Sequence, residues 1–177
     1  DTKLVNWDTK LETAISDLEV EQRETQSNLY YIKYKLCCEN TYITIATTRP
    51  ETLLGDTAVA VNPKDERYKK YIGKQIIVPI IDRKVKIIAD EYVSIEQGSG
   101  ALKVTPAHDF NDFDIGKRHK LEFINIFEKN GKLNNSAPQD LIGIDRFEAR
   151  KIIIKKLKEL NLKDKIANIK NTVPFGD

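Results

Sequence analysis

Short runs in which apolar and polar residues alternate predict a chain built mainly from strands. Residues 28–36 are rich in aromatic and branched side chains, and residues 42–46 repeat that pattern after a turn signal at Glu39-Asn40. Two such runs around a turn predict an antiparallel hairpin. Further strands are expected over residues 57–61, 74–81, 84–89, 101–105 and 123–127.

Apolar residues three or four positions apart predict the helices. The clearest helix covers residues 145–160, where Asp145 can cap the N-terminus and Glu148 occupies the third helical position. Its apolar residues, opposite a lysine-rich face, are Phe147, Ile152, Ile154, Leu157 and Leu160. Residues 109–119 predict a second helix, and residues 64–72 predict a short one. Short strands with a few helices between them indicate an α+β, β-rich fold.

The composition narrows the class of protein. With 177 residues, of which 40% are hydrophobic, the chain is long enough to form one globular domain. Its formal net charge of +2 allows contact with nucleic acid at one patch but does not argue for it. No apolar run approaches the roughly 20 residues of a membrane helix, so no membrane partner is expected. The only cysteines, Cys37 and Cys38, indicate a reducing compartment, and a chain that starts at Asp1 without any methionine is expected to be a segment of a longer protein.

Polar, reactive side chains gather around two of the predicted strands. One group begins directly after residues 42–46, and the other begins within residues 101–105. Together they offer hydroxyls, two cations, an imidazole and carboxylates, which can hold a polar substrate and orient a water molecule. The candidate residues are Thr47, Thr48, Arg49, Glu51, Thr52, Lys103, Thr105, His108, Asp109 and Asp112.

Local structure offers other roles for some of these residues. Thr48 with Glu51, and Asp109 with Asp112, also fit the capping patterns of helix N-termini. His108 alone also fits a structural, hydrogen-bonding role. Two histidines and no suitable cysteines argue against a catalytic zinc site, so no metal and no other cofactor is expected.

The lysines near the C-terminus have two interpretations, a solvated helix face or a contact surface for an RNA backbone. They are Lys151, Lys155, Lys156, Lys158, Lys163 and Lys165. The sequence leaves both interpretations open.

Two segments, residues 46–61 (ATTRPETLLGDTAVAV) and 98–112 (GSGALKVTPAHDFND), resemble the active-site segments of the editing domain inserted in valyl-tRNA synthetases. Residues 11–21 (LETAISDLEVE) and 173–177 (VPFGD) resemble the arms that lead into and out of that insertion. The Thr-Thr-Arg-Pro and Pro-Ala-His-Asp motifs also resemble the leucyl enzymes, whereas the Lys-Val-Thr sequence at 103–105 favours the valyl type. The resemblance covers nearly the whole chain, and nothing in it resembles the ATP-binding signatures of a synthetase.

The resemblance implies a single editing domain over residues 1–177, with a barrel-like core at 28–167, peripheral helices, and extended arms at 1–27 and 168–177. It implies an aminoacyl-tRNA deacylase that performs post-transfer editing, releasing threonine from the mischarged 3′ end of tRNA(Val). The expected partners are that tRNA end and, in the same polypeptide, the remainder of the synthetase, all in the cytoplasm. This segment would not itself charge tRNA.

The resemblance also implies roles for the candidate residues. Asp112 binds the α-ammonium of the substrate, which agrees with the natural pairing of a carboxylate and an amine. Lys103 lines the pocket and can stabilise charge on the attacked carbonyl. The other substrate-binding residues are Thr47, Thr48, Arg49, Glu51, Thr52 and Thr105, and the residues that hold the geometry or the water are His108 and Asp109. No general base is assigned, and the ribose hydroxyl of the substrate is a candidate.

Two alternative functions stay open at this point. One is a leucyl-type editing hydrolase, and the other is a non-catalytic module that only binds the tRNA 3′ end. Deacylation assays with two mischarged tRNAs would separate these alternatives from valyl-type editing.

Overall fold

The computed structural model describes residues 28–168, which form one seven-stranded sheet and a small number of helices. The strands are β1 (Asn28–Leu36), β2 (Tyr42–Thr47), β3 (Ala58–Val61), β4 (Gln75–Val78), β5 (Arg83–Ala89), β6 (Ala101–Val104) and β7 (Lys163–Asn168). The α-helices are α2 (Phe110–Arg118) and α3 (Arg146–Glu159), and the 3₁₀ helices are η1 (Pro50–Gly55), η2 (Lys69–Tyr71) and η3 (Gln139–Leu141). The predicted arm at 1–27 and most of that at 168–177 lie outside the described residues.

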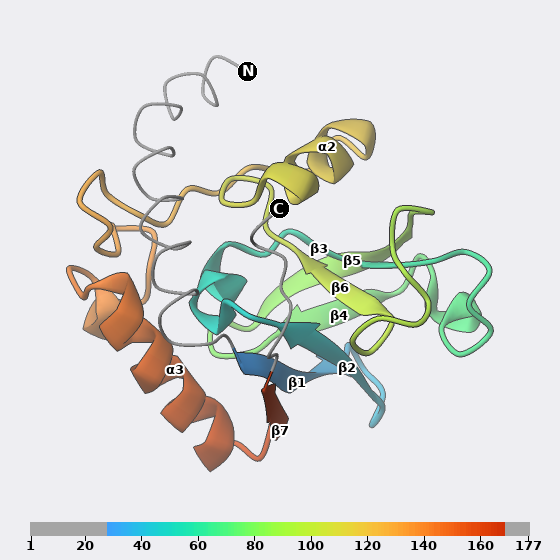
Figure 1. Ribbon diagram of the computed structural model, residues 1–177, viewed down its shortest axis with the longest axis horizontal. Helices are drawn as coiled ribbons and strands as arrows, with labels where there is room; N and C mark the ends of the chain where they lie inside the picture. The colour runs from blue at the N-terminus through green and yellow to red at the C-terminus, as the bar shows by residue number, and fades with distance from the viewer. Residues whose placement is uncertain (1–27, 169–177) are drawn as a thin grey trace.

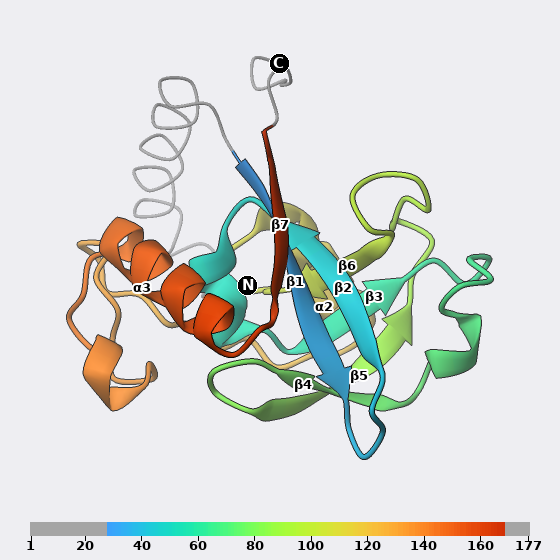
Figure 2. The same ribbon diagram turned by 90° about the horizontal axis from the view of Figure 1, so that it is seen from below.

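The sheet curls into a nearly closed barrel (Figures 1 and 2). Its strand order is β2-β1-β4-β5-β3-β6, β7 pairs with β1, and β6 lies beside β2 where the barrel closes. β1 and β2 form the predicted antiparallel hairpin, with Tyr34 opposite Ile43. β3 runs parallel to β5 and antiparallel to β6. The expectation of an α+β, β-rich and barrel-like fold is therefore confirmed. Within residues 28–168, no helix is long and apolar enough to cross a membrane.

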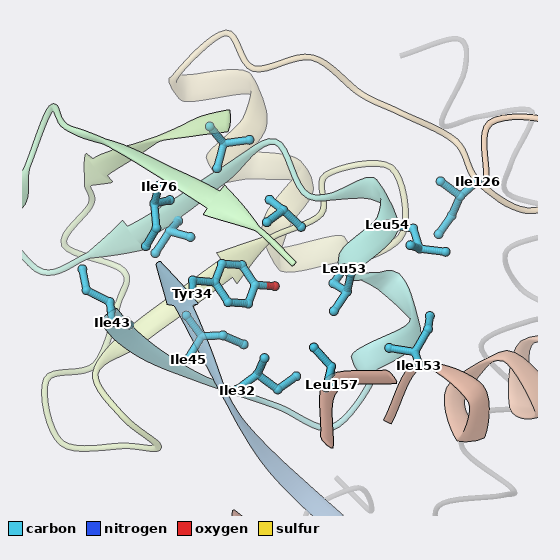
Figure 3. Close-up of a cluster of buried hydrophobic side chains, with 14 of the residues drawn as sticks. Ile32, Tyr34, Ile43, Ile45, Leu53, Leu54, Ile76, Ile126, Ile153 and Leu157 are labelled. Atoms are coloured by element: carbon cyan, nitrogen blue, oxygen red, sulfur yellow. The ribbon is translucent and has the colours of Figure 1, made fainter. Parts of the chain in front are cut away.

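Side chains from the barrel, η1 and α3 fill one core (Figure 3). In β1 every second residue near the C-terminal end points inward, because side chains alternate along a strand. Those residues are Ile32, Tyr34 and Leu36. Leu53 of η1 and Leu157 of α3 are fully buried on the same cluster. Full burial of one such side chain stabilises the fold by about 1.5–3 kcal/mol, so the core fixes η1 against the barrel.

The buried face of α3 differs from the predicted one. The helix begins as expected, because the side chain of Asp145 accepts a hydrogen bond from the amide of Phe147 at 2.9 Å. Its buried apolar residues are Ala149, Ile153 and Leu157, which are spaced four residues apart, whereas Leu160 is 54% exposed. The helix packs against η1 along this one narrow stripe, so apolar residues to either side of the stripe stay partly exposed.

Three other local predictions were wrong. The helix predicted over residues 64–72 is only the 3₁₀ helix η2 at its end, and residues 123–127 form no strand apart from a single bridge at Phe127. β7 was not predicted, because its sequence KDKIAN is mainly polar. It pairs with the N-terminal half of β1, so Lys163 and Lys165 belong to a strand instead of a helix face.

Candidate functional site

The two predicted active-site segments meet through a hydrogen bond from Lys103 of β6 to Thr52 of η1, and the helix α2 contacts β6. Gly55, the last residue of η1, permits this close approach. A Cβ at Gly55 would lie 3.2 Å from Cγ2 of Thr105 and 3.1 Å from the carbonyl oxygen of Ile124. A larger residue would therefore push η1 away from the polar end of β6.

Lys103 lies at the centre of a buried polar cluster. Its side chain is 5% exposed, and its Nζ donates to Oγ1 of Thr52 at 2.6 Å and to Oγ1 of Thr105 at 2.5 Å. The same Nζ forms an ion pair with Oδ1 of Asp56 at 2.9 Å. The three ammonium protons of Lys103 thus have three acceptors, and the cation lies beside a buried anion. Contact between Lys103 and a substrate carbonyl would require exchange of one of these bonds.

Asp112 lies next to this cluster at the start of α2. Asp112 is 6% exposed, and its Oδ2 accepts a hydrogen bond from the amide of Thr105 at 2.8 Å. Burial, followed by the nearby charge of Asp109, raises the pKa of Asp112 to about 7. A substrate cation placed against this carboxyl would favour the ionised form. Asp112 therefore has the burial and charge expected of an ammonium-binding group.

Asp109 forms the N-cap of α2, as one of the two predicted interpretations had it. Its Oδ1 accepts hydrogen bonds from the amides of Asn111 at 2.9 Å and Asp112 at 3.0 Å. These bonds fix the first turn of α2 and with it the backbone of Asp112. A further part for Asp109 in holding a water molecule stays a prediction.

Arg49 connects the end of β2 to the loop that precedes α2. Its NH1 donates to the carbonyl oxygen of His108 at 2.8 Å, and its backbone amide donates to Oγ1 of Thr47 at 3.0 Å. Its Nε is buried and has no hydrogen-bond acceptor among residues 28–168. An unpaired buried donor costs about 1–3 kcal/mol, so a ligand that brings an acceptor to this atom would recover that energy.

His108 is held in a structural position. Its Nε2 accepts a hydrogen bond from the amide of Ile126 at 3.0 Å, and its ring meets Phe127 edge-on. Burial, reinforced by the charge of Arg49, lowers the pKa of His108 to about 3, so the ring is neutral near pH 7. Because its lone pair on Nε2 is already used, His108 cannot take a proton from water at that atom. A part in holding a water through the rest of the ring stays a prediction.

The capping box predicted for Thr48 and Glu51 is wrong. Arg49 precedes η1 as its cap residue and makes no side-chain capping bond. The carboxylate of Glu51 is fully buried and pairs with Arg150 of α3 through two bonds of 2.8 and 3.0 Å. Thr48 is half-buried at the end of β2. Glu51 therefore ties η1 to α3, and its predicted part in substrate binding stays a prediction.

The structure adds Asp56 and Tyr34 to the site, which were not among the candidates. Asp56 directly follows η1, and its Oδ2 accepts a hydrogen bond from the hydroxyl of Tyr34 at 2.6 Å. One sequence signal could have revealed Asp56. It is a lone carboxylate in a stretch that is otherwise apolar or small between Leu53 and Val61, and a charge in such a stretch must be buried and paired. Among residues 28–168 no group of three or more His, Cys, Asp or Glu side chains is placed to hold a metal ion.

Comparisons with known proteins identify the family. The family model described as "Leucyl-tRNA synthetase, editing domain" matches residues 67–172, which is more than half of the chain. The valine–tRNA ligase of Pelagibacter ubique is 63% identical over 177 residues, 100% of this chain and 20% of that protein. The valine–tRNA ligase of Coxiella burnetii is 51% identical over 99% of this chain and 19% of that protein. The chain thus spans about a fifth of the length of these relatives.

The fold agrees with this similarity. It is similar to that of a leucyl-tRNA synthetase of Agrobacterium radiobacter K84, whose crystal structure is a ternary complex with tRNA and LeuAMS. The TM-score is 0.62 at 20% sequence identity, over 91% of this chain and 24% of that one. The family model, the relatives along the whole chain and the shared barrel agree with one another. The chain belongs to the family of aminoacyl-tRNA synthetase editing domains and corresponds to the editing segment of valine–tRNA ligases.

Proposed function

We propose that this domain hydrolyses the ester of threonine wrongly attached to tRNA(Val). The observation that carries the proposal is the meeting of buried Asp112 with the hydroxyl and ammonium cluster around Lys103. A carboxyl suited to an amine thus lies beside hydroxyl oxygens suited to a polar side chain. The similarity to valine–tRNA ligases supports tRNA(Val) as the tRNA that carries the substrate. The similar size of threonine and valine explains why an editing reaction is needed.

The need follows from the near-identical shapes of threonine and valine. The valyl enzyme is the standard example of this limit, because an apolar pocket rejects threonine by only about a hundredfold. A second site that pairs with the threonine hydroxyl can do better. When valine enters such a site, the polar groups lose their partner, which costs roughly 1–3 kcal/mol for each buried group.

The site residues divide the work of binding and reaction. Asp112 holds the α-ammonium, and the oxygens of Thr52 and Thr105 accept the hydroxyl proton of threonine. Arg49 offers its Nε, which has no acceptor among residues 28–168, to the ester or the terminal adenosine. Water attacks the ester carbonyl, the ribose oxygen leaves, and the products are free threonine and tRNA with an intact 3′ end. Because an aminoacyl ester is already reactive, an oriented water can suffice without a covalent nucleophile.

The partners follow from the same proposal. The 3′ end of tRNA(Val) delivers the substrate, and the remainder of the ligase in the same polypeptide supplies aminoacylation, in the cytoplasm. The synthetase–tRNA complex that shares this fold supports a tRNA partner. The exposed lysines of α3 are a candidate contact for the RNA backbone.

Deacylation assays test the proposal. Threonyl-tRNA(Val) and valyl-tRNA(Val) are incubated with the protein, and release of the amino acid is followed over time. We expect rapid loss of threonine and retention of valine. Equal rates on the two esters would contradict threonine editing, and binding of the tRNA end without release of either amino acid would favour a non-catalytic module. Hydrolysis of a mischarged tRNA(Leu) in preference to tRNA(Val) would favour a leucyl-type domain.

A further inference from the structure

A buried pair, Tyr34 and Asp56, lies behind the proposed substrate-binding residues. Tyr34 is fully buried in the core, and Figure 3 shows its hydroxyl pointing toward η1, which carries Leu53. That hydroxyl donates to Oδ2 of Asp56 at 2.6 Å, and Asp56 is also fully buried. A charged carboxylate in the core is costly unless it is paired and hydrogen-bonded, so its presence calls for an explanation beyond packing.

Within the cluster, the hydrogen bonds of Asp56 fix the proton of Thr105 and one proton of Lys103. Oδ1 of Asp56 accepts from Oγ1 of Thr105 at 2.8 Å, so the hydroxyl proton of Thr105 is used there. Oγ1 of Thr52 donates its proton to the carbonyl oxygen of Arg49 at 2.9 Å. Lys103 donates one proton to each threonine oxygen and one to Asp56.

This arrangement leaves the two threonine oxygens as hydrogen-bond acceptors only, which is here called the polarity of the cluster. Each threonine hydroxyl donates its own proton in one hydrogen bond and accepts a second hydrogen bond from Lys103. A hydroxyl oxygen has two lone pairs, so one lone pair remains on Thr52 and one on Thr105. Toward a bound molecule these two oxygens can accept a hydrogen bond but cannot donate one.

The backbone around Asp56 is held as firmly as its side chain. NH1 of Arg83 donates to the carbonyl oxygens of Leu54 at 3.0 Å and of Asp56 at 2.8 Å. The amide of Asp56 donates to the carbonyl of Leu53 at 3.0 Å. Burial, together with the charge of Asp56, raises the pKa of Tyr34 well above its usual value, so the phenol stays a donor. The carboxylate therefore has one orientation.

We propose that Asp56, oriented by Tyr34, is a positioning residue that sets the polarity of the site so that it selects a substrate hydroxyl. The inference rests on the proposed function and names the basis of its selectivity. A threonine hydroxyl can donate to the free lone pair of Thr52 or Thr105, while the methyl group of valine cannot. Asp56 acts through Thr105 and Lys103, and Tyr34 acts through Asp56, so neither needs to touch the substrate.

A purely structural role for the Asp56–Lys103 ion pair predicts a different kinetic result. If Asp56 only neutralises Lys103, its loss lowers the hydrolysis of every ester in the same proportion, through lower stability or a displaced Lys103. If Asp56 sets the polarity, its replacement by asparagine leaves one acceptor oxygen for the two hydroxyls of Tyr34 and Thr105. The proton of Thr105 is then no longer held away from the substrate, and the advantage of a hydroxyl-bearing substrate falls. The informative comparison substrate is the 2-aminobutyryl ester, because 2-aminobutyrate is threonine without its hydroxyl.

The experiment measures kcat/KM of the full chain on threonyl- and 2-aminobutyryl-tRNA(Val). The variants are Asp56→Asn and Tyr34→Phe, with Asp65→Asn as the matched control. Asp65 is another carboxylate with little exposed surface, and it pairs with the half-exposed Arg67 in the loop after β3, away from the Lys103 cluster. Thermal unfolding of every variant shows which proteins are folded at the assay temperature.

We expect Asp56→Asn to reduce the preference for the threonyl ester roughly thirtyfold, with a smaller change on the 2-aminobutyryl ester, because hydrogen bonds to a charged group are lost. Tyr34→Phe removes one hydrogen bond to a charged group and should reduce the same preference roughly three- to tenfold. Asp65→Asn should lower the melting temperature without changing the preference. If Asp56→Asn fails to fold, Tyr34→Phe decides.

An unchanged preference in folded Tyr34→Phe or Asp56→Asn, or an equal fall on both esters, would overturn the positioning role. Failure of the wild-type chain to hydrolyse either ester would instead remove the proposed function, and the positioning role with it. The two failures are therefore distinguishable from the wild-type rates alone.

Discussion

Replacement of Asp112 by asparagine separates recognition of the substrate amine from support of the fold. Asparagine keeps the shape of the side chain and an oxygen that can accept from the amide of Thr105, which lies 2.8 Å from Oδ2 of Asp112. The cap of α2 is unaffected, because it is formed by Asp109. The change therefore removes one negative charge and little else.

The effect on stability follows from the pKa of Asp112, which rises from 3.8 to about 7 in the folded protein. Between these values the folded state binds more protons than the unfolded state, so this carboxyl makes the protein less stable as pH rises from about 4 to about 7. A shift of this size corresponds to at most about 4 kcal/mol above pH 7. Asp112→Asn should therefore melt at or above the wild-type temperature at pH 8, and its advantage should shrink as pH falls toward 4.

The effect on activity should have the opposite sign. Loss of a buried charge partner of the ammonium costs about 2–5 kcal/mol in binding of the transition state, which is at least about a thirtyfold fall in rate. In the wild type, kcat/KM on threonyl-tRNA(Val) should rise as pH rises through about 7, because only the ionised carboxyl pairs with an ammonium. The variant should lose this part of the pH dependence.

The assay combines single-substrate deacylation with thermal unfolding at several pH values. A threonyl ester with an acetylated amine is the control, because wild type and variant should hydrolyse it at similar rates. Full activity of Asp112→Asn, or a loss that only accompanies unfolding, would refute the amine-binding role and leave Asp112 as a structural acceptor for Thr105.

Three further predictions concern the surroundings of the site. Glu51→Gln removes the charge that pairs with Arg150 and should lower the free energy of unfolding by about 1.5–3 kcal/mol in denaturant titrations. A change under about 1 kcal/mol would mean that this ion pair contributes little to stability. Gly116→Ala places a Cβ 2.7 Å from Cβ of Pro106 and should cost about 1–3 kcal/mol with reduced deacylation, whereas an unchanged melting temperature would show that α2 can shift freely. EDTA should leave deacylation unchanged, since residues 28–168 hold no cluster of metal-binding side chains; loss of activity that zinc or magnesium restores would contradict this.

Local patterns in the sequence determined much of the fold. The hairpin of β1 and β2, the caps of α2 and α3, and the strand at β6 depend on residues close together in the chain. Alternation, capping residues and turn residues act over a few positions, so one sequence contains their full signal. The resemblance likewise gave the family and the two active-site segments, because their motifs are contiguous.

Tertiary structure decided the features that depend on distant partners. β7 is a strand because the edge of β1 is free to pair, although its own sequence is polar. Glu51 fits a helix cap when only its neighbours are considered, but it pairs with Arg150, which lies 99 positions away. A local sequence pattern does not include such a distant partner. The contact that buries the charge of Glu51 therefore outweighs its local preference for a helix cap.

The chemistry of the site was divided in the same way. The sequence supplied Lys103, Thr105 and Asp112 as residue types, but their protonation and hydrogen bonds arise from burial between η1, β6 and α2. The raised pKa of Asp112 comes first from loss of contact with water, which no residue type determines by itself. Asp56 and Tyr34, 22 positions apart, meet only when the barrel closes around them. The residue types set which chemical groups are available, and the fold sets which of them are buried, charged and in contact with one another.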